Sequence, residues 1–300
     1  MEICKASPKE LTQIYANVHE SWPHHPDRDI HIKLRLESVQ HQYASWYMGH
    51  VNGEIVASLG WYPFEFKDKG KIYHGAGIGA VHTPPQFRRQ GYAQQLLQGV
   101  HAIMKGKGVD ISHLYSDIDP CYYQKLGYQI CPTVHVSHQP QAGELSNGLQ
   151  IKPWKPSGWE QRDHIYRLFG PETTFHRCAK HWQWLEQRFP RTQHVQVFHN
   201  DDQPIGYLSF SAAYRTYPQQ LIDAVFPKDL PFSQICTLVE QAAWLAGMRA
   251  EFIAWYPSSV AAGDERAKAA SKEIPMILRL NDAVPPYLAE SLWFFPMEHI

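Results

Sequence analysis

Hydrophobic residues in the first half of the chain switch several times between helical and strand-like spacing. A short apolar run over 2–6 predicts a strand. Ser7 and Pro8 then open a helix, because proline is favoured in a first turn and the apolar residues that follow share one helical face. Those residues are Leu11, Ile14, Tyr15 and Val18. The pattern further predicts helices over 29–43, 92–105 and 120–125, and strands over 45–51, 54–62, 74–83, 113–118 and 128–138.

The dipeptide Asn52-Gly53 stands between two of these apolar runs. Both residue types tolerate the positive φ angles that a two-residue hairpin turn requires. The strands over 45–51 and 54–62 are therefore predicted to pair as antiparallel neighbours.

The second half repeats this order of elements faintly. Polar, turn-forming residues over 139–149 predict a linker or an exposed loop. The recurrence of helix, hairpin, strand, helix and strand suggests a duplicated α/β unit, with domains over 1–138 and 150–300. The pattern predicts strands over 148–154, 194–199, 205–210, 220–226, 250–255 and 276–280, a hairpin turn at 200–202, and helices over 159–169 and 232–245, the latter capped by Ser233.

The composition is that of a globular protein. Of the 300 residues, 44% are hydrophobic and 19% are charged. Lysine and arginine number 28 and aspartate and glutamate 29, so the net charge is -1. Neither half has the basic excess of a nucleic-acid-binding surface, and no apolar run is long enough to span a membrane. We therefore expect neither nucleic acid nor membrane as a partner.

The five cysteines contain no C-x-x-C pair, which argues against a disulfide framework and against a structural zinc site. The N-terminus also lacks the apolar stretch of a signal peptide. These features predict a protein of the reducing cytoplasm. The pair His24-His25 and the spacing His135-x-x-His138 are compatible with metal ligands, but the sequence places no third ligand, so no metal site is predicted.

The segment that indicates chemistry is Arg88-Arg89-Gln90-Gly91-Tyr92-Ala93, between a predicted strand and a predicted helix. A helix start offers free backbone N–H groups and the positive end of the helix dipole, which together favour a phosphate. A glycine lets the backbone approach closely, a small alanine leaves room for the anion, and the arginines add charge. The segment therefore predicts a diphosphate cradle, and the alternative is an ordinary helix start with a solvated arginine pair.

This R-x-x-G-x-A segment is followed, one strand and one short helix later, by the Y-x-x-L-G-Y element over 123–128. Together the two elements resemble the GNAT superfamily of N-acetyltransferases over most of residues 1–138. The resemblance implies an α/β fold with a mixed central sheet flanked by helices, and a second, degenerate GNAT-like domain. It also implies acetyl-CoA as co-substrate, held by the strand segment Val81, His82 and Thr83 and by the loop Arg88, Arg89, Gln90, Gly91, Tyr92, Ala93 and Gln94.

Two narrower groups share features with the chain. The stretches TPPQFRRQGYA and LYSDIDPCYYQKLGY are similar to fungal lysine N-acetyltransferases, and the paired halves resemble the enhanced-intracellular-survival acetyltransferases, which modify aminoglycosides. Both likenesses imply an amine acceptor without fixing which amine. The second likeness also implies that the terminal carboxylate of Ile300 reaches the active site, and simple packing of the apolar tail is the alternative.

Attack of an amine on a thioester needs a proton for the departing thiolate. A tyrosine, with a pKa near 10, can give a proton to a thiolate whose acid has a pKa of about 8.5. Tyr123 is the predicted general acid, the position at which the family also places it, and its neighbour Tyr122 is the rival. Packing of one or both rings beneath the CoA strand is the alternative.

Three further residues are candidates around the predicted cleft. Asp117 and Asp119 are spaced to share a strand face, so that Asp117 could bind a cationic acceptor and Asp119 the pantetheine arm. Asp119 precedes a proline and is equally suited to cap a turn. Trp22 follows the first helix, where the superfamily builds its acceptor site, and it could wall that site or lie in the core.

The second half has no R-x-x-G-x-A segment. At the corresponding place it carries 226–231, which has no glycine and two prolines that remove N–H donors, so it is predicted not to bind CoA. The sequence therefore predicts an acetyl-CoA-dependent N-acetyltransferase of a small amine, with a covering or self-associating second half and a possible homo-oligomer. The alternatives are a non-catalytic acyl-CoA sensor and a protein N-acetyltransferase.

Overall fold

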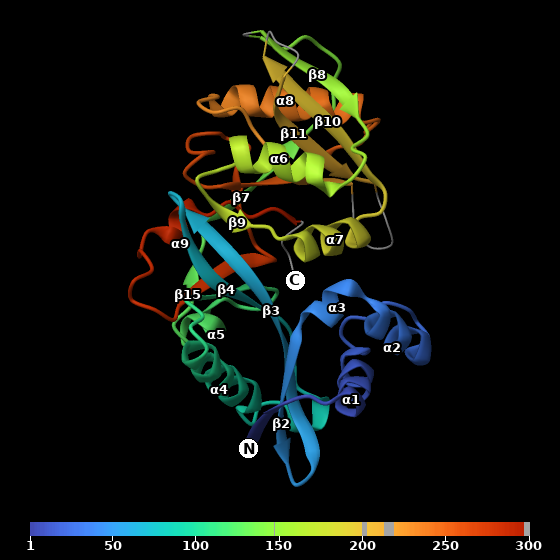
Figure 1. Cartoon of the computed structure of the whole chain (residues 1–300), viewed down its shortest axis with the longest axis vertical. Helices are drawn as coiled ribbons and strands as arrows, with labels where there is room; N and C mark the ends of the chain where they lie inside the picture. The colour runs from blue at the N-terminus through green and yellow to red at the C-terminus, as the bar shows by residue number, and fades with distance from the viewer. Residues whose placement is uncertain (147, 200–202, 213–218, 297–300) are drawn as a thin grey trace.

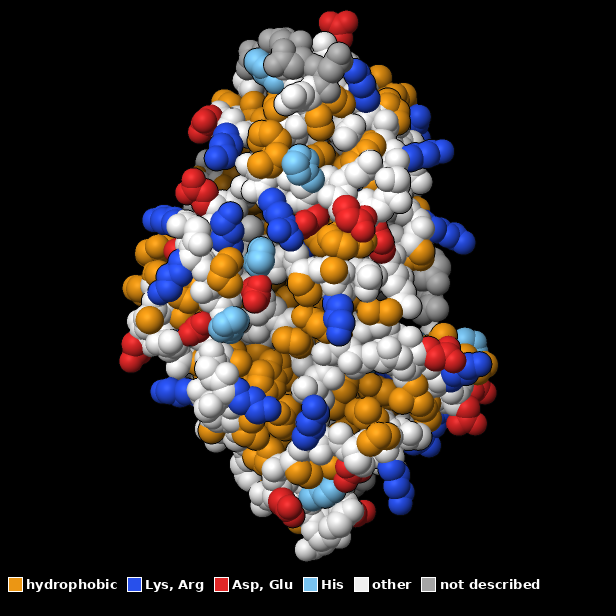
Figure 2. All heavy atoms as spheres, in the orientation of Figure 1, with side chains coloured by type: hydrophobic (Ala, Val, Ile, Leu, Met, Phe, Trp, Pro, Cys, Tyr) orange, Lys and Arg blue, Asp and Glu red, His pale blue; other side chains and the backbone are white. Residues whose placement is uncertain are grey.

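The computed structural model describes residues 1–146, 148–199, 203–212 and 219–296. Within these residues the chain forms two mixed sheets, one in each half of the molecule, with helices against them (Figure 1). The predicted α/β class is confirmed. No helix in the described ranges combines the length and the hydrophobicity needed to cross a membrane. On the face seen in Figure 2, charges of both signs are scattered rather than gathered into one patch.

The first sheet has the strand order β1-β2-β3-β4-β5-β15-β6, with β9 paired to the far end of β3. Its neighbours pair antiparallel except β4 and β5, which are parallel. The strands are β1 (Glu2–Lys5), β2 (Ser45–Val51), β3 (Glu54–Asp68), β4 (Lys71–His82), β5 (Ile111–Ser116), β6 (Gln129–Ile130), β9 (Thr173–His176) and β15 (Ile274–Arg279).

The second sheet has the order β8-β10-β11-β12-β13-β7-β14 and repeats the plan of the first. The parallel pair β12 and β13 stands where β4 and β5 stand in the first sheet. The repeated order of elements is thus present in the structure. The strands are β7 (Thr133–His138), β8 (Leu149–Trp154), β10 (Thr192–His199), β11 (Pro204–Ser211), β12 (Gln220–Val225), β13 (Phe252–Pro257) and β14 (Lys268–Ala269).

The helices follow the same plan, since α4 connects β4 to β5 and α8 connects β12 to β13. The helices of the first half are α1 (Pro8–Val18), α2 (Arg28–Glu37), α3 (Val39–Tyr43), α4 (Tyr92–Gly106) and α5 (Cys121–Gln124), with a 3-10 turn over Pro85–Phe87. Those of the second half are α6 (Trp159–Phe169), α7 (Ala179–Arg188), α8 (Phe232–Leu245) and α9 (Leu288–Ser291).

The two halves exchange one strand each. β15, from the second half of the sequence, lies between β5 and β6, and β7, from the first half, lies between β13 and β14. The single strand predicted over 128–138 is therefore wrong, because β6 and β7 belong to different sheets. The predicted division into 1–138 and 150–300 describes the order along the chain, whereas each folded sheet needs a strand from the other segment.

An aromatic core joins the halves. Phe64 of β3 packs against Phe175 of β9 with ring centroids 5.5 Å apart, and Tyr115 of β5 packs against Phe294 at 5.8 Å. These residues belong to one buried cluster that spans both parts of the sequence. Burial of large rings is the main stabilising contribution at such a contact, so the halves form one packed unit.

Local signals explain where several elements begin and end. Ser7 caps α1 with a reciprocal Ser7–Glu10 capping box, as its position before Pro8 predicts. Asn52 and Gly53 have φ angles of 52° and 82° and turn the hairpin between β2 and β3, which confirms that prediction. The helix predicted over 29–43 is broken at Ser38, whose backbone is extended and separates α2 from α3. Ser233 does not cap α8, because the N-cap residue is Pro231.

Candidate active site

The site begins where β4 and β5 separate. Their parallel register covers only Gly75 to Gly77 against Ile111 to His113 among the described residues. Beyond it, residues of both strands line a cavity of about 840 Å³, among them Ile78 and Val81 of β4 and Leu114 of β5. A gap between parallel strands that both carry buried side chains can accept an extended chain between them.

A bulge in β4 turns backbone toward this cavity. Ser58 and Gly60 of β3 face His82 and Gly79 of β4, so the residues Ala80 and Val81 both lie opposite a single residue of β3. Ala80 has a φ of 49°, which is rare for a residue with a β-carbon. Bulges re-aim the backbone next to active sites, and both bulge residues line the cavity.

A second, smaller cavity of about 230 Å³ lies at the start of α4. Gly91 is the N-cap residue and has a φ of 79°, and a β-carbon there would meet only the end of Gln95. The first-turn N–H groups of a helix have no partners within the helix, so this concave start suits an anion. The cavity is lined by Thr83, Phe87, Arg88, Arg89, Gly91, Tyr92, Ala93, Gln94 and Tyr122.

The predicted cradle residues are thus largely brought together. Of the predicted loop, Gln90 alone is absent from the wall of the small cavity, and its side chain instead donates to the carbonyl of Gln86 at 3.3 Å. Val81 lines the larger cavity and Thr83 the smaller one. His82 lines neither, and its buried side chain contacts Glu20.

Glu20, just beyond α1, ties the cradle to the neighbouring helix. Its carboxylate accepts a hydrogen bond from Arg88 and contacts Nε2 of His82 at 3.1 Å. Arg88 also donates from Nε to the carbonyl of Thr83 at 2.9 Å. Burial lowers the pKa of His82, against the opposing effect of Glu20. Arg88 is consequently positioned along the rim of the cradle.

The two adjacent tyrosines face different cavities. Tyr123 is 8% exposed and lines the larger cavity, whereas Tyr122 lines the cradle. Burial, with smaller contributions from Tyr122 and Asp117, raises the pKa of Tyr123 above its ordinary value. The hydroxyl stays protonated across the physiological range but is a weaker acid than a free tyrosine, so the case for Tyr123 as a proton donor rests on its place in the cavity wall. The geometry favours Tyr123 over Tyr122 for a role beside the strand gap.

Asp117 and Asp119 do not share a strand face, because β5 ends at Ser116. Asp117 lines the larger cavity. Asp119 lines neither cavity, and its Oδ1 accepts a hydrogen bond from the backbone N–H of Cys121 at 2.9 Å, which is the turn-capping role. Trp22 is 39% exposed and lines the larger cavity, so it lies in the wall and not in the core.

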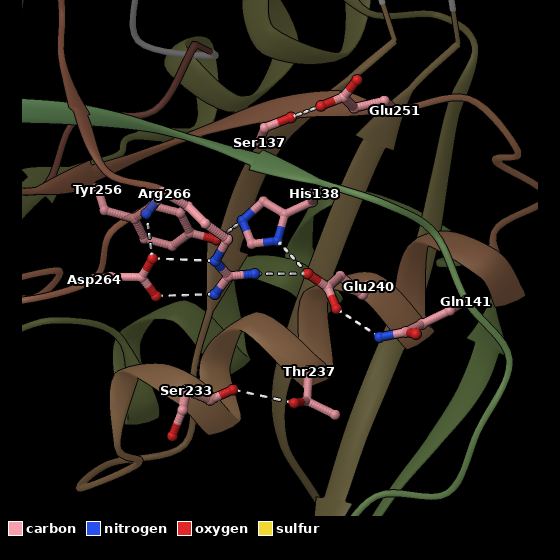
Figure 3. A network of polar contacts seen from close by, with 10 residues as sticks. All are labelled: Ser137, His138, Gln141, Ser233, Thr237, Glu240, Glu251, Tyr256, Asp264 and Arg266. Atoms are coloured by element: carbon pink, nitrogen blue, oxygen red, sulfur yellow. Dashed lines mark hydrogen bonds and ion pairs between the residues drawn. The ribbon is translucent and has the colours of Figure 1, made fainter.

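His135 and His138 line neither of these cavities. Ile300 is outside the described residues. His138 bonds Glu240 at 3.2 Å and the Tyr256 hydroxyl at 3.0 Å, as part of a network that Arg266 completes (Figure 3). His135 stacks on Trp255. No group of three or more His, Cys, Asp or Glu side chains in the described ranges is placed to hold a metal ion.

The second half contributes cavity residues that sequence reasoning missed. α7 was not predicted, and it places Trp184 and Arg188 on the cavity wall, where Ser211 of β11 and Glu273 before β15 join them. No local motif marks these residues, because the contact between α7 and the first half depends on the packing of two distant segments. The cavity therefore lies between the halves.

Residues 2–131 match the family model described as an acetyltransferase (GNAT) domain. This segment is thus a GNAT acetyltransferase domain, which confirms the predicted resemblance to the GNAT superfamily over this range. No curated protein matches the chain.

Solved structures share the paired fold at low sequence identity. A GCN5-related N-acetyltransferase from Anabaena variabilis is 17% identical with a TM-score of 0.70, over 93% of this chain and 73% of that one. Eis1 from Mycobacterium abscessus is 14% identical with a TM-score of 0.59, over 93% and 74%. A tandem GNAT protein from the clavulanic acid biosynthesis pathway is 12% identical with a TM-score of 0.54, over 93% and 98%. The chain is thus similar in fold to tandem GNAT proteins across both halves.

Proposed function

We propose that this protein transfers the acetyl group of acetyl-CoA to a small amine. The observation that carries the proposal is the continuity of three features around one strand gap: the anion cradle at Gly91, the bulge at Ala80 and Val81, and the buried hydroxyl of Tyr123. Each feature meets a separate requirement of thioester aminolysis.

The cradle supports binding of the diphosphate of acetyl-CoA. Gly91 leaves open space above the first turn of α4, and Arg89 adds positive charge beside it, while the charge of Arg88 is paired with Glu20. The gap between β4 and β5 leads from the cradle toward Tyr123 and suits an extended pantetheine arm. The residues therefore fit the co-substrate that the GNAT family uses.

The chemistry then follows from the residues at the end of the gap. A new C–N bond forms as the neutral amine attacks the thioester carbonyl, and backbone N–H groups near Val81, His82 and Thr83 stabilise the developing oxyanion. The C–S bond breaks, and Tyr123 gives its proton to the departing sulfur. The attacking nitrogen loses a proton, which restores the tyrosine, so an acceptor that arrives as an ammonium ion releases one net proton per turnover.

The test is release of CoA thiol from acetyl-CoA with a panel of amino acids, polyamines and aminoglycosides, alongside calorimetric titration of acetyl-CoA. Binding together with thiol release for one acceptor class is the expected result. Binding without release for any acceptor would favour an acyl-CoA sensor. A failure to bind acetyl-CoA would contradict the cradle and the proposed function together.

A further inference from the structure

The Y-x-x-L-G-Y element over 123–128 ends in a second tyrosine, Tyr128, which lines neither cavity. Its backbone N–H donates to the carbonyl of Tyr123 at 3.2 Å, and the N–H of Gly127 donates to the carbonyl of Gln124 at 2.9 Å. Gly127 has a φ of 91°, so these two bonds form the Schellman motif that ends a helix at a glycine. The spacing of the element thus returns the chain to Tyr123.

The rings of the two tyrosines are in contact as a result. Tyr123 and Tyr128 meet edge to face, with ring centroids 5.9 Å apart and planes at 73°. An apolar contact between these two positions commonly accompanies the Schellman motif. Tyr122 also packs edge to face on Tyr123, at 5.0 Å. The hydroxyl of Tyr123 has no hydrogen-bond partner within the described part of the chain, so ring packing holds it at the cavity wall.

Hydrogen bonds in turn fix the ring of Tyr128. Its hydroxyl lies 2.7 Å from Oγ of Ser112 and 2.9 Å from Nε2 of His101, and all three side chains are buried. A phenol hydroxyl donates one hydrogen bond and accepts another, so it can satisfy both partners. Burial lowers the pKa of His101 to about 4, so this network is uncharged at neutral pH. Buried hydrogen bonds of this kind restrict the Tyr128 ring to one position.

The network also connects Tyr123 to the helix that begins at the cradle. His101 lies on the buried face of α4, and Ser112 belongs to β5. The Tyr128 hydroxyl is therefore bonded to the helix that follows the strand gap and to one strand of the gap itself. Through the ring contact, these bonds set the place of Tyr123 relative to the helix whose start forms the cradle.

We propose that Tyr128 is a positioning residue, which holds the hydroxyl of Tyr123 toward the departing sulfur through the contact of the two rings. This inference rests on the proposed acetyltransferase function and adds a residue to its mechanism. A general acid must lie within hydrogen-bond reach of the atom that it protonates. A displacement of about 1 Å at a reacting group can cost about 100-fold in rate. Tyr128 therefore bears on kcat and not on the affinity for acetyl-CoA.

The test removes the hydrogen-bonded hydroxyl and keeps the ring. Tyr128→Phe should lower kcat for thiol release about tenfold, while KM for acetyl-CoA stays within about twofold of wild type. Ser112→Ala should have the same effect on a smaller scale, since the bond between Tyr128 and His101 remains. Tyr166→Phe is the matched control, because the Tyr166 hydroxyl is also buried and hydrogen-bonded, at 2.6 and 2.8 Å, and lies in neither cavity wall. The control should keep the wild-type kcat.

A double-mutant cycle distinguishes positioning from general support of the fold. The acid is absent in Tyr123→Phe, so adding Tyr128→Phe should lower the residual kcat by no more than about twofold. A residue that only supports the fold would lower the rate by the same factor in both backgrounds. An equal factor in the two backgrounds, or an unchanged kcat in the single variant Tyr128→Phe, would overturn the inference.

A measurement without turnover separates the inference from the proposed function. In protein with isotope-labelled tyrosine rings, the NMR signal of Tyr123 is the one that disappears in Tyr123→Phe. Tyr128→Phe should speed the flipping of the Tyr123 ring, and Tyr166→Phe should leave it unchanged. Unchanged flipping of the Tyr123 ring in Tyr128→Phe would overturn the inference, whether or not an acceptor is found. Absence of acetyl-CoA binding or of thiol release in wild-type protein would instead contradict the proposed function.

Discussion

The two halves share one strand plan but treat the gap between their parallel strands in opposite ways. In the first half, β4 leads through Gly91 into α4, and the gap opens into the large cavity. In the second half, β12 leads through 226–231 into α8, and aromatic rings at both ends of this segment pack against neighbouring rings. Phe226 packs on Trp293 at 5.9 Å, and Phe232 packs on Tyr256 at 5.0 Å.

The buried polar side chains of the two regions also differ in whether they have hydrogen-bond partners. Beside the second sheet, Glu240 contacts both His138 and Arg266, and Gln141 and Asp264 complete the network (Figure 3). In the cavity between the halves, Trp184 and Ser211 keep buried polar atoms without partners in the described chain. The same strand order thus supports a ligand cavity in one half and a packed core in the other. The difference lies in the residues at the helix start and between the two parallel strands.

The strand exchange gives the largest expected effect, because it tests whether the first half can fold and bind acetyl-CoA without a strand from the second half. A fragment covering 1–149 lacks β15, whose Met276 and Ile277 are fully buried between β5 and β6. We expect this fragment to lose cooperative folding and all acetyl-CoA binding, as measured by denaturant titration and calorimetry. Co-expression of 150–300 should restore both. A fragment that binds acetyl-CoA like the full chain would show that the first half is autonomous.

Removal of the buried tyrosine hydroxyl tests the chemistry of the first half alone. Tyr123→Phe should lower kcat roughly 100-fold, because the departing sulfur loses its proton donor, and it should leave the affinity for acetyl-CoA unchanged. Tyr122→Phe is the matched control and should retain most activity. Steady-state thiol release measures both variants. Unchanged turnover in Tyr123→Phe would remove Tyr123 from the mechanism.

A pair of glycine variants separates backbone strain from loss of the cradle. Gly91 and Gly108 have φ angles of 79° and 75°, so valine at either position should cost about 1–2 kcal/mol of stability. Only Gly91→Val should also weaken acetyl-CoA binding, by about tenfold or more, since its side chain would intrude on the anion cradle. Denaturant titration and calorimetry give the two readings. If Gly108→Val weakened acetyl-CoA binding as much as Gly91→Val does, the loss of binding would be a consequence of lower protein stability and not of a blocked cradle.

The second-half network should affect stability without affecting the site. Glu240→Gln is expected to destabilise the protein by about 2 kcal/mol at neutral pH, because His138 and Arg266 lose a charged partner. Burial opposes ionisation of Glu240, but its contacts with His138 and Arg266 prevail and lower its pKa from the ordinary value of 4.5. Its stabilising effect is therefore complete above that value and declines as the pH falls through the lowered pKa.

The matching measurement is the free energy of unfolding of wild type and Glu240→Gln between pH 3 and pH 7. The difference between the two proteins should shrink toward acid pH, and the affinity of the variant for acetyl-CoA at pH 7 should equal that of wild type. A difference that grows toward acid pH would contradict the assigned charge state of Glu240.

Local patterns predicted much of the fold because they depend on neighbouring residues. The Asn52-Gly53 hairpin and the Ser7 cap are set by short-range geometry, and the helix that follows Gly91 was predicted from the spacing of its apolar residues. The strand exchange could not be predicted in this way, because nothing in the run over 128–138 specifies that its two ends pair with different sheets.

The residues of the candidate site likewise fall into those that local motifs mark and those that only long-range packing brings to the cavity. The cradle and Tyr123 are adjacent in sequence to the motifs that mark them, whereas Trp184, Arg188 and Glu273 reach the cavity only through packing of the second half. α7 escaped prediction because its buried face mixes tryptophan with polar residues such as His181, which weakens the helical hydrophobic pattern. Asp117 and Asp119 were misplaced for a simpler reason, since β5 ends at Ser116, before either residue.

The measurement that tests the contrast between the halves most directly is the stoichiometry of acetyl-CoA binding by calorimetric titration of the full chain. We expect one molecule per chain, with binding lost in Gly91→Val and unchanged in Lys228→Gln, which alters the corresponding segment of the second half. Two molecules per chain, or a single site that responds to Lys228→Gln and not to Gly91→Val, would contradict it.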